Sequence, residues 1–166
     1  MSMAWVALTD LSERPEIGKT IATCREIPDG VVFTGLLASL PGNSGPVGFA
    51  IARKMGGPPF LMNDLLKFKA RSSRSDIHFS VALEDAQMKT AWGELTFEKS
   101  FKPSQHQQEF QFLVSELRPK IRGKPAPAFT IIRNQIVSFS FQILRSRQDQ
   151  ALLSEAPLEF ELTITW

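Results

Sequence analysis

Apolar and polar residues alternate along most of the chain, and this period of two predicts β-strands. The longest alternation runs from Leu158 to Trp166, with an apolar residue at every second position. Further alternating or apolar segments cover residues 31–40, 47–52, 66–70, 77–83, 94–98, 110–114 and 137–143. No segment keeps apolar residues at helical spacing for three turns, so we expect at most single helical turns, at 59–66 or 114–117.

Strands of this length and spacing are typical of a sandwich or barrel. The turn-forming stretch 41–46 separates two of them, and no linker or repeat divides the chain. The sequence therefore predicts one β-sandwich domain over residues 1–166. Its core is expected to contain the inward-facing side chains of Phe79, Val81, Phe139, Phe141, Phe160 and Leu162.

Composition narrows the class of protein. A hydrophobic share of 43% is enough for a real core. Nineteen basic against 17 acidic residues give a net charge of +2, which does not suggest a nucleic-acid partner. The longest apolar run, 30–40, is too short to span a membrane, and the first residues lack the pattern of a leader. We expect a cytoplasmic or organelle-interior protein with any leader absent, and no integral membrane segment.

No nucleophile or metal centre can be assembled from the sequence. Ser44 lies in a glycine-rich turn, but both histidines, His78 and His106, follow it and stand far apart. Cys24 is the only cysteine, so it cannot form an internal disulfide and is interpreted as a structural thiol. We expect no enzyme activity, no cofactor and no metal.

The acidic residues do not select a catalytic pair either. Glu84 and Asp85 follow the strand 77–83 and are expected in a solvated loop. Alternation places Glu94 and Glu98 on the solvent face of their strand. The sequence therefore assigns these carboxylates to the surface.

The strongest polar feature is the segment 118–125, interpreted as a proline-bounded cationic loop. Its cations are Arg118, Lys120, Arg122 and Lys124. Arginines can bind carboxylates or phosphates through two parallel hydrogen bonds, so these four residues are the candidate partner-binding site. A solvated connection is the alternative.

A series of short motifs carries a family resemblance. The series is Phe33-Thr34-Gly35, Gly48 to Arg53, Asp64 to Ala70, His78 to Leu83, Glu116 to Pro119 before Arg122-Gly123, Ile136 to Phe141, and Leu158 to Leu162. In this order the motifs resemble the complex I intermediate-associated protein 30 family. The glycine pair that usually follows an early tryptophan in that family is missing after Trp5, which indicates a diverged member.

The resemblance implies a galactose-binding-like jelly roll of two antiparallel sheets and a non-catalytic scaffold. Members of the family look like assembly factors for the respiratory NADH:ubiquinone oxidoreductase. Our main hypothesis is therefore a protein-interaction module with an unidentified protein partner. The alternative is a carbohydrate-binding domain of the same fold. An exposed Trp92 beside arginine or aspartate would favour the sugar, whereas buried tryptophans together with an exposed basic or apolar patch would favour the protein partner.

Overall fold

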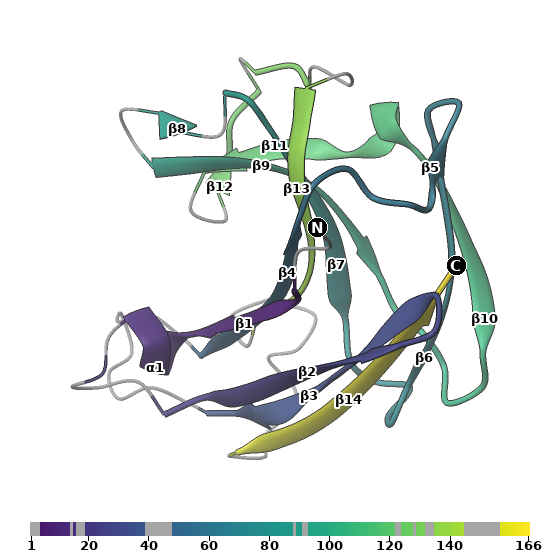
Figure 1. Cartoon of the computed structure of the whole chain (residues 1–166). Coiled ribbons are helices and arrows are strands. Elements are labelled where there is room, and N and C mark those ends of the chain that lie inside the picture. Colours follow the sequence, from purple (N-terminus) through teal and green to yellow (C-terminus); the bar gives the residue numbers. More distant parts are fainter. Residues whose placement is uncertain are drawn as a thin grey trace.

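The structure, a computed structural model, describes residues 4–13, 15, 19–38, 48–87, 89–90, 93–121, 124–127, 129–131, 135–144 and 157–166. Two antiparallel sheets make up most of these residues (Figure 1). Sheet A has the order β1 (Val6–Thr9), β4 (Phe49–Met55), β13 (Ile136–Leu144), β7 (Phe79–Asp85), β9 (Gly93–Phe101), β11 (Arg118–Ile121), β12 (Lys124–Pro125), and β8 (Lys89–Thr90) pairs with β9. Sheet B has the order β10 (Gln108–Leu113), β6 (Leu65–Ser72), β14 (Leu158–Thr165), β3 (Gly30–Leu37), β2 (Ile21–Ile27), and β5 (Leu61–Met62) pairs with β6.

The core lies between the two sheets and is rich in phenylalanine. All six residues predicted for it are at most 1% exposed, which confirms the predicted inward faces. Phe141 and Phe68 contact each other across the two sheets, with ring centroids 5.5 Å apart. Trp5 and Trp166 cover one edge of this core, and their ring centroids are 6.5 Å apart. Trp92 lies outside the described residues.

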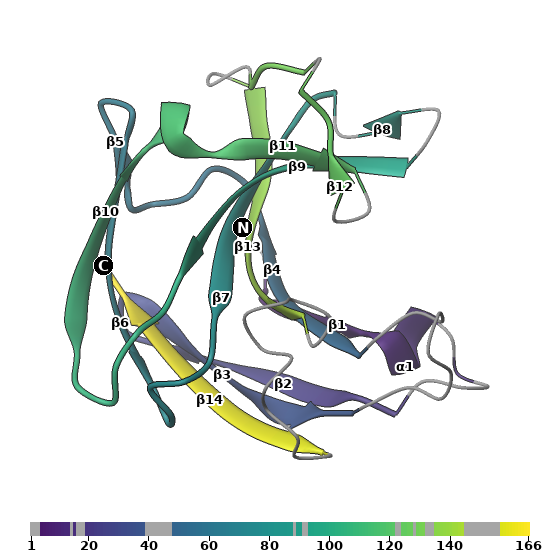
Figure 2. The same ribbon diagram turned by 180° about the vertical axis from the view of Figure 1, so that it is seen from behind.

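Sheet A bends strongly. In Figures 1 and 2, β1, β8 and β12 extend to one side of the central strands β4, β13 and β7, while β6 and β10 of sheet B lie on the other side. The face of sheet A that points away from sheet B is therefore the inside of the bend.

Helical structure in the described part is short and includes α1 (Asp10–Glu13) and the 3-10 turn η1 (Val114–Glu116). The turn at 114–117 was predicted, whereas 59–66 contains a turn and the short strand β5 instead. Within the described residues no helix is long and apolar enough to cross a membrane. Burial raises the pKa of the Cys24 thiol to about 11, so the thiol is protonated at neutral pH, as expected for a structural cysteine.

A buried carboxylate fastens the start of the chain to both sheets. Asp10 accepts hydrogen bonds from the backbone N–H groups of Lys19 at 2.7 Å, Thr20 at 3.0 Å and Phe49 at 3.1 Å. Burial disfavours the charged carboxylate, but hydrogen bonds from Thr20, Lys19 and Phe49 outweigh it and lower the pKa of Asp10. Asp10 thus connects α1 to the beginnings of β2 and β4.

Replacing Asp10 with asparagine should lower the free energy of unfolding by roughly 1–3 kcal/mol at pH 7. The amide keeps one acceptor oxygen but turns an N–H donor toward one of the three backbone donors. Because the pKa is lowered in the folded state, the stabilisation by Asp10 is present above its ordinary value of 3.8 and is lost as the pH falls through the folded value. Urea unfolding at pH 7 measures the loss, with the exposed turn residue Asp29→Asn as the matched control; equal stabilities of the two variants would contradict the prediction.

Candidate functional site

The inside of the bend in sheet A is lined by polar residues. Phe139 and Phe141 point into the core, so the alternate residues of β13 point to the opposite face. The same alternation holds on the paired strands. We call this surface the outer face of sheet A. Its polar and small residues are Arg53, Ser80, Ala82, Glu84, Glu94, Thr96, Glu98, Arg118, Lys120, Ser138, Ser140 and Gln142, and its β1 and β4 side also carries the apolar residues Val6, Leu8, Ile51 and Met55.

Strand register places small residues in the middle of this face and long charged residues on both sides. One row across the strands runs from Arg53 through Ser140, Ala82 and Glu98 to Arg118. Short side chains on β13 and β7 therefore lie between longer charged side chains on β4, β9 and β11, and the short ones are covered.

Much of this polar face is buried as deeply as the core. Ser138, Ser140 and Glu84 are each 1% exposed, and Ser80 and Ala82 are fully buried. Buried polar groups in proteins are normally hydrogen-bonded, because an unmade hydrogen bond costs free energy. We therefore ask which hydrogen-bond or ion-pair partner each of these buried side chains has.

Arg53 forms the centre of the charged network. Its side chain passes over the small serines of β13, and its Nη2 lies 2.9 Å from Glu84 Oε1 and 3.4 Å from Glu94 Oε2. Burial raises the pKa of Glu84, the positive charge of Arg53 lowers it, and the negative charge of Glu94 raises it further, so the net shift is upward. A long side chain in the middle of β13 would obstruct this path.

A second set of contacts lies toward β11. Lys120 Nζ is 3.9 Å from Glu98 Oε1, and the Thr96 hydroxyl donates a 2.7 Å hydrogen bond to Glu98 Oε2. Gln142 donates a 3.1 Å hydrogen bond to Ser140 Oγ. Glu98 is therefore held at the wall of the face.

The buried Glu84 carboxylate has partners on this face. Arg53 Nη2 lies 2.9 Å from it and the Ser138 hydroxyl interacts with it, and both lower the pKa that burial raises. Arg53 Nε and the Ser80 hydroxyl are buried without a hydrogen-bond partner among the described residues. The groups of the face that a polar ligand could reach are therefore the more exposed side chains of Arg53, Glu94, Arg118 and Lys120.

Two expectations from the sequence are wrong here. Glu84 and Asp85 are not in a solvated loop, because β7 continues through both and they are almost fully buried. Glu98 is also buried, at 6% exposure, although it does point away from the core as predicted. The signal that could have revealed this face is the run of serines at 138 and 140, where a solvated strand usually carries longer polar side chains.

The predicted partner-binding residues lie partly on the same face. Arg118 and Lys120 belong to β11 and Lys124 to β12, so a loop was the wrong interpretation for 118–121 and 124–125. Arg118 and Lys124 are exposed, whereas Lys120 is half-buried beside Glu98. Arg122 lies outside the described residues.

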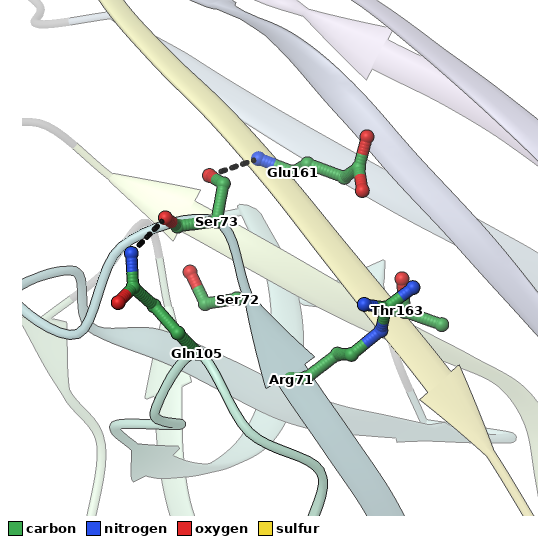
Figure 3. A pocket seen from close by; sticks show the side chains of 6 residues that line it. All are labelled: Arg71, Ser72, Ser73, Gln105, Glu161 and Thr163. Atoms are coloured by element: carbon green, nitrogen blue, oxygen red, sulfur yellow. Dashed lines mark hydrogen bonds between the residues drawn. The ribbon is translucent and has the colours of Figure 1, made fainter.

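A polar hollow of about 200 Å³ lies on sheet B where β6 ends beside β14 (Figure 3). It is lined by Arg71, Ser72, Ser73, Gln105, Glu161 and Thr163. Ser73 accepts hydrogen bonds from the Glu161 N–H at 3.0 Å through its hydroxyl and from Gln105 Nε2 at 2.9 Å through its carbonyl oxygen. None of the buried unpartnered side-chain atoms found in the described residues lies in this hollow, so the outer face of sheet A is the stronger candidate.

Comparison with known proteins gives likenesses of structure alone. No family model and no curated protein sequence matches the chain. A family 11 carbohydrate-binding module of a Clostridium thermocellum cellulosomal cellulase aligns with 99% of this chain and 87% of its own, at 12% identity and a TM-score of 0.56. A family 11 module from that organism in complex with a β-1,3-1,4-mixed-linked tetrasaccharide aligns with 99% of this chain and 94% of its own, at 13% identity and a TM-score of 0.55.

A family 30 carbohydrate-binding module of another cellulosomal cellulase of that organism aligns with 99% of this chain and 90% of its own, at 9% identity and a TM-score of 0.55. Identities this low establish the fold alone. The protein is thus a jelly-roll β-sandwich of two antiparallel sheets, which confirms the predicted fold class.

Proposed function

We propose that this chain is a non-catalytic carbohydrate-binding module that binds a polysaccharide at the outer face of sheet A. The observation that carries the proposal is the group of accessible polar side chains on that face, Arg53, Glu94, Arg118 and Lys120, together with the likeness of the fold to carbohydrate-binding modules. Sugar hydroxyl groups both donate and accept hydrogen bonds, so they complement a surface that offers guanidinium donors, carboxylate acceptors and serine hydroxyls. The likeness to carbohydrate-binding modules over nearly the whole chain supports the same reading.

The proposal is tested by affinity electrophoresis of the full chain through gels that contain soluble polysaccharides. Retardation by at least one polysaccharide, with dissociation constants then measured calorimetrically on its oligosaccharides, is the expected result. The absence of retardation across neutral, acidic and amino polysaccharides would overturn it. Product analysis after long incubation checks that the polysaccharide is bound and not cleaved.

The hypothesis of a respiratory-complex assembly factor stays a prediction that rests on the sequence resemblance. The surface where such a protein partner would bind is the β11–β12 hairpin, which carries the exposed residues Arg118 and Lys124. A partner that binds there would be an acidic protein surface.

Replacing Arg118, Lys120, Arg122 and Lys124 together with serine should weaken capture of such a partner at low salt and change the melting temperature little. Exposed charges such as Arg118 and Lys124 contribute only about 0–1 kcal/mol to folding, so any larger stability change should come from Lys120, which lies 3.9 Å from the buried Glu98. Salt screens the same interaction, so the difference from the wild type should shrink as ionic strength rises. Pull-down from the native source measures the effect, and equal capture by both proteins at low salt would show that the hairpin is only solvated.

A further inference from the structure

We infer that the outer face of sheet B, the face that points away from sheet A, is a docking site for an extended segment of a partner protein. In this segment a lysine or arginine stands two positions from an apolar residue. The site is built on β14, β3 and β2, on the side of the sandwich opposite to the outer face of sheet A. It therefore goes beyond the carbohydrate binding proposed above and does not depend on it.

A groove crosses the outer face of sheet B. The hollow at the end of β6 shares Ser73 and Glu161 with a larger hollow of about 890 Å³ that continues over β14 and β3 (Figure 3). Strand register places Glu161 beside Thr34 and Glu159 beside Leu36. The larger hollow is lined by Thr34, Gly35, Leu36, Ser73, Arg74, Glu159, Phe160 and Glu161.

Two carboxylates in this groove have no partner. Among the glutamates whose side chains the structure describes, Glu159 and Glu161 alone form neither an ion pair nor a side-chain hydrogen bond. The others all lie within ion-pair distance of a lysine or arginine; they are Glu26, Glu84, Glu94, Glu98, Glu109 and Glu116. Glu159 and Glu161 are exposed on the same face of β14, two positions apart, so their like charges repel. A cation placed between them would form ion pairs with both.

The cations that border the groove do not neutralise these carboxylates. Arg74 is held by Asp76, to which its guanidinium donates hydrogen bonds of 2.9 and 2.6 Å. Arg71 lies at the far end beside Thr163, and no ion pair links it to Glu161 (Figure 3). The middle of the groove is therefore negative and complements a basic group. The Arg71 guanidinium can donate hydrogen bonds to the main-chain carbonyl oxygens of a peptide that continues past the carboxylates.

Two apolar side chains adjoin the carboxylates. Leu36 is 40% exposed and lies beside Glu159, and Ile21, 56% exposed, lies beside Leu36 on β2. Covering this pair with an apolar side chain removes apolar surface from water and so favours association. A metal ion at the carboxylates would leave the pair uncovered, whereas a peptide with both basic and apolar residues covers the whole site.

The spacing of these groups defines the sequence that fits them. Neighbouring strands lie about 4.8 Å apart, so the middle of the Leu36–Ile21 pair is about 7 Å from β14 and its carboxylates. In an extended peptide the side chains on one face repeat every two residues, also at about 7 Å. A basic residue and an apolar residue two positions apart therefore reach both groups at once when the peptide lies across the strands.

The test uses the full chain, isotope-labelled for NMR, and the acetylated and amidated peptide Ser-Lys-Ser-Leu-Ser-Lys-Ser-Leu in a buffer that contains EDTA. The peptide should shift amide resonances of β14, β3 and β2, and titration of these shifts gives the dissociation constant. A peptide with glutamate in place of lysine, or with serine in place of leucine, should bind roughly tenfold more weakly or worse.

Variants of exposed residues separate the two kinds of contact. Glu159→Gln combined with Glu161→Gln should weaken binding of the lysine peptide roughly tenfold and remove most of its salt dependence. Leu36→Ser should weaken binding by a similar factor and leave the salt dependence in place. The matched control is Glu109→Gln, an exposed glutamate of the same sheet that pairs with Lys67, which should bind like the wild type.

Equal binding of the lysine and glutamate peptides would overturn the inference, as would unchanged binding by the double glutamine variant. Shifts confined to sheet A would place the peptide elsewhere, and no shift at millimolar peptide would show that the groove is only solvated. None of these results bears on carbohydrate binding. Because the two outer faces lie on opposite sides of the sandwich, polysaccharide retardation in affinity electrophoresis should be the same with and without the peptide.

Discussion

Phe141→Ala is expected to lower the free energy of unfolding by about 3–5 kcal/mol. Phe141 is fully buried on β13, and its ring lies among those of Trp5, Phe60, Phe68 and Phe101. Removing the ring leaves a cavity between the two sheets, which rigid strands fill poorly. Domains of this size have a total stability of only about 5–15 kcal/mol, so the loss is a large part of it.

Urea unfolding followed by tryptophan fluorescence measures this loss, since the Trp5 ring stacks on that of Phe141 with centroids 6.4 Å apart. Met62→Ala is the control, because Met62 is 74% exposed and its truncation should change stability by less than about 0.5 kcal/mol. A similar small change for Phe141→Ala would mean that the two sheets do not pack as described.

The second large effect is expected for Arg53→Met, which should lower the free energy of unfolding by about 3 kcal/mol at pH 7. Removing one partner of a buried ion pair leaves the other charge uncompensated, and Glu84 would then be buried without its nearest cation. The partial exposure of Arg53 places the expected loss at the lower end of the usual range for such pairs.

This loss should depend on pH in a defined direction. Burial raises the pKa of Glu84 even with Arg53 present, so its contribution to stability is complete below the ordinary value of 4.5 and is lost as the pH rises through the folded value. Removing Arg53 raises the folded pKa further, so the deficit of Arg53→Met should be largest near neutral pH and shrink toward pH 4.5.

Two companion variants identify the cause. The double variant Arg53→Met with Glu84→Gln should recover much of the lost stability, because no buried charge remains. Arg71→Met, at an exposed position of sheet B, should change stability by less than about 0.5 kcal/mol. A deficit of Arg53→Met that is equal at pH 4.5 and pH 7 would assign the effect to lost packing of the side-chain methylenes.

The inward faces of the strands could be predicted from the sequence because burial on one side leaves a period of two. Phe160 and Leu162 on β14, or Phe79 and Val81 on β7, show it directly. The order of strands in each sheet could not be predicted, since it depends on contacts between segments far apart in the chain. The pairing of β14 with both β3 and β6 is an example.

The candidate site was hidden from the sequence for a different reason. Alternation identifies a polar face but does not distinguish a polar face in water from one inside a bend. Glu84 was therefore assigned to solvent, and Arg53 was not singled out, although register brings them within reach across β13. The bend of sheet A accumulates from strand to strand across the sheet, so no short sequence motif indicates it.

The contact between the Trp5 and Trp166 rings has a consequence for engineering. Residues near the two ends of the chain meet at one edge of the core, so a short peptide joining them would close the chain into a ring with little distortion. New ends could then be opened at an exposed turn such as Asn63-Asp64, between β5 and β6. A circularly permuted protein made in this way would present Arg53 and its neighbours unchanged while attaching a fusion partner at a different point of the surface.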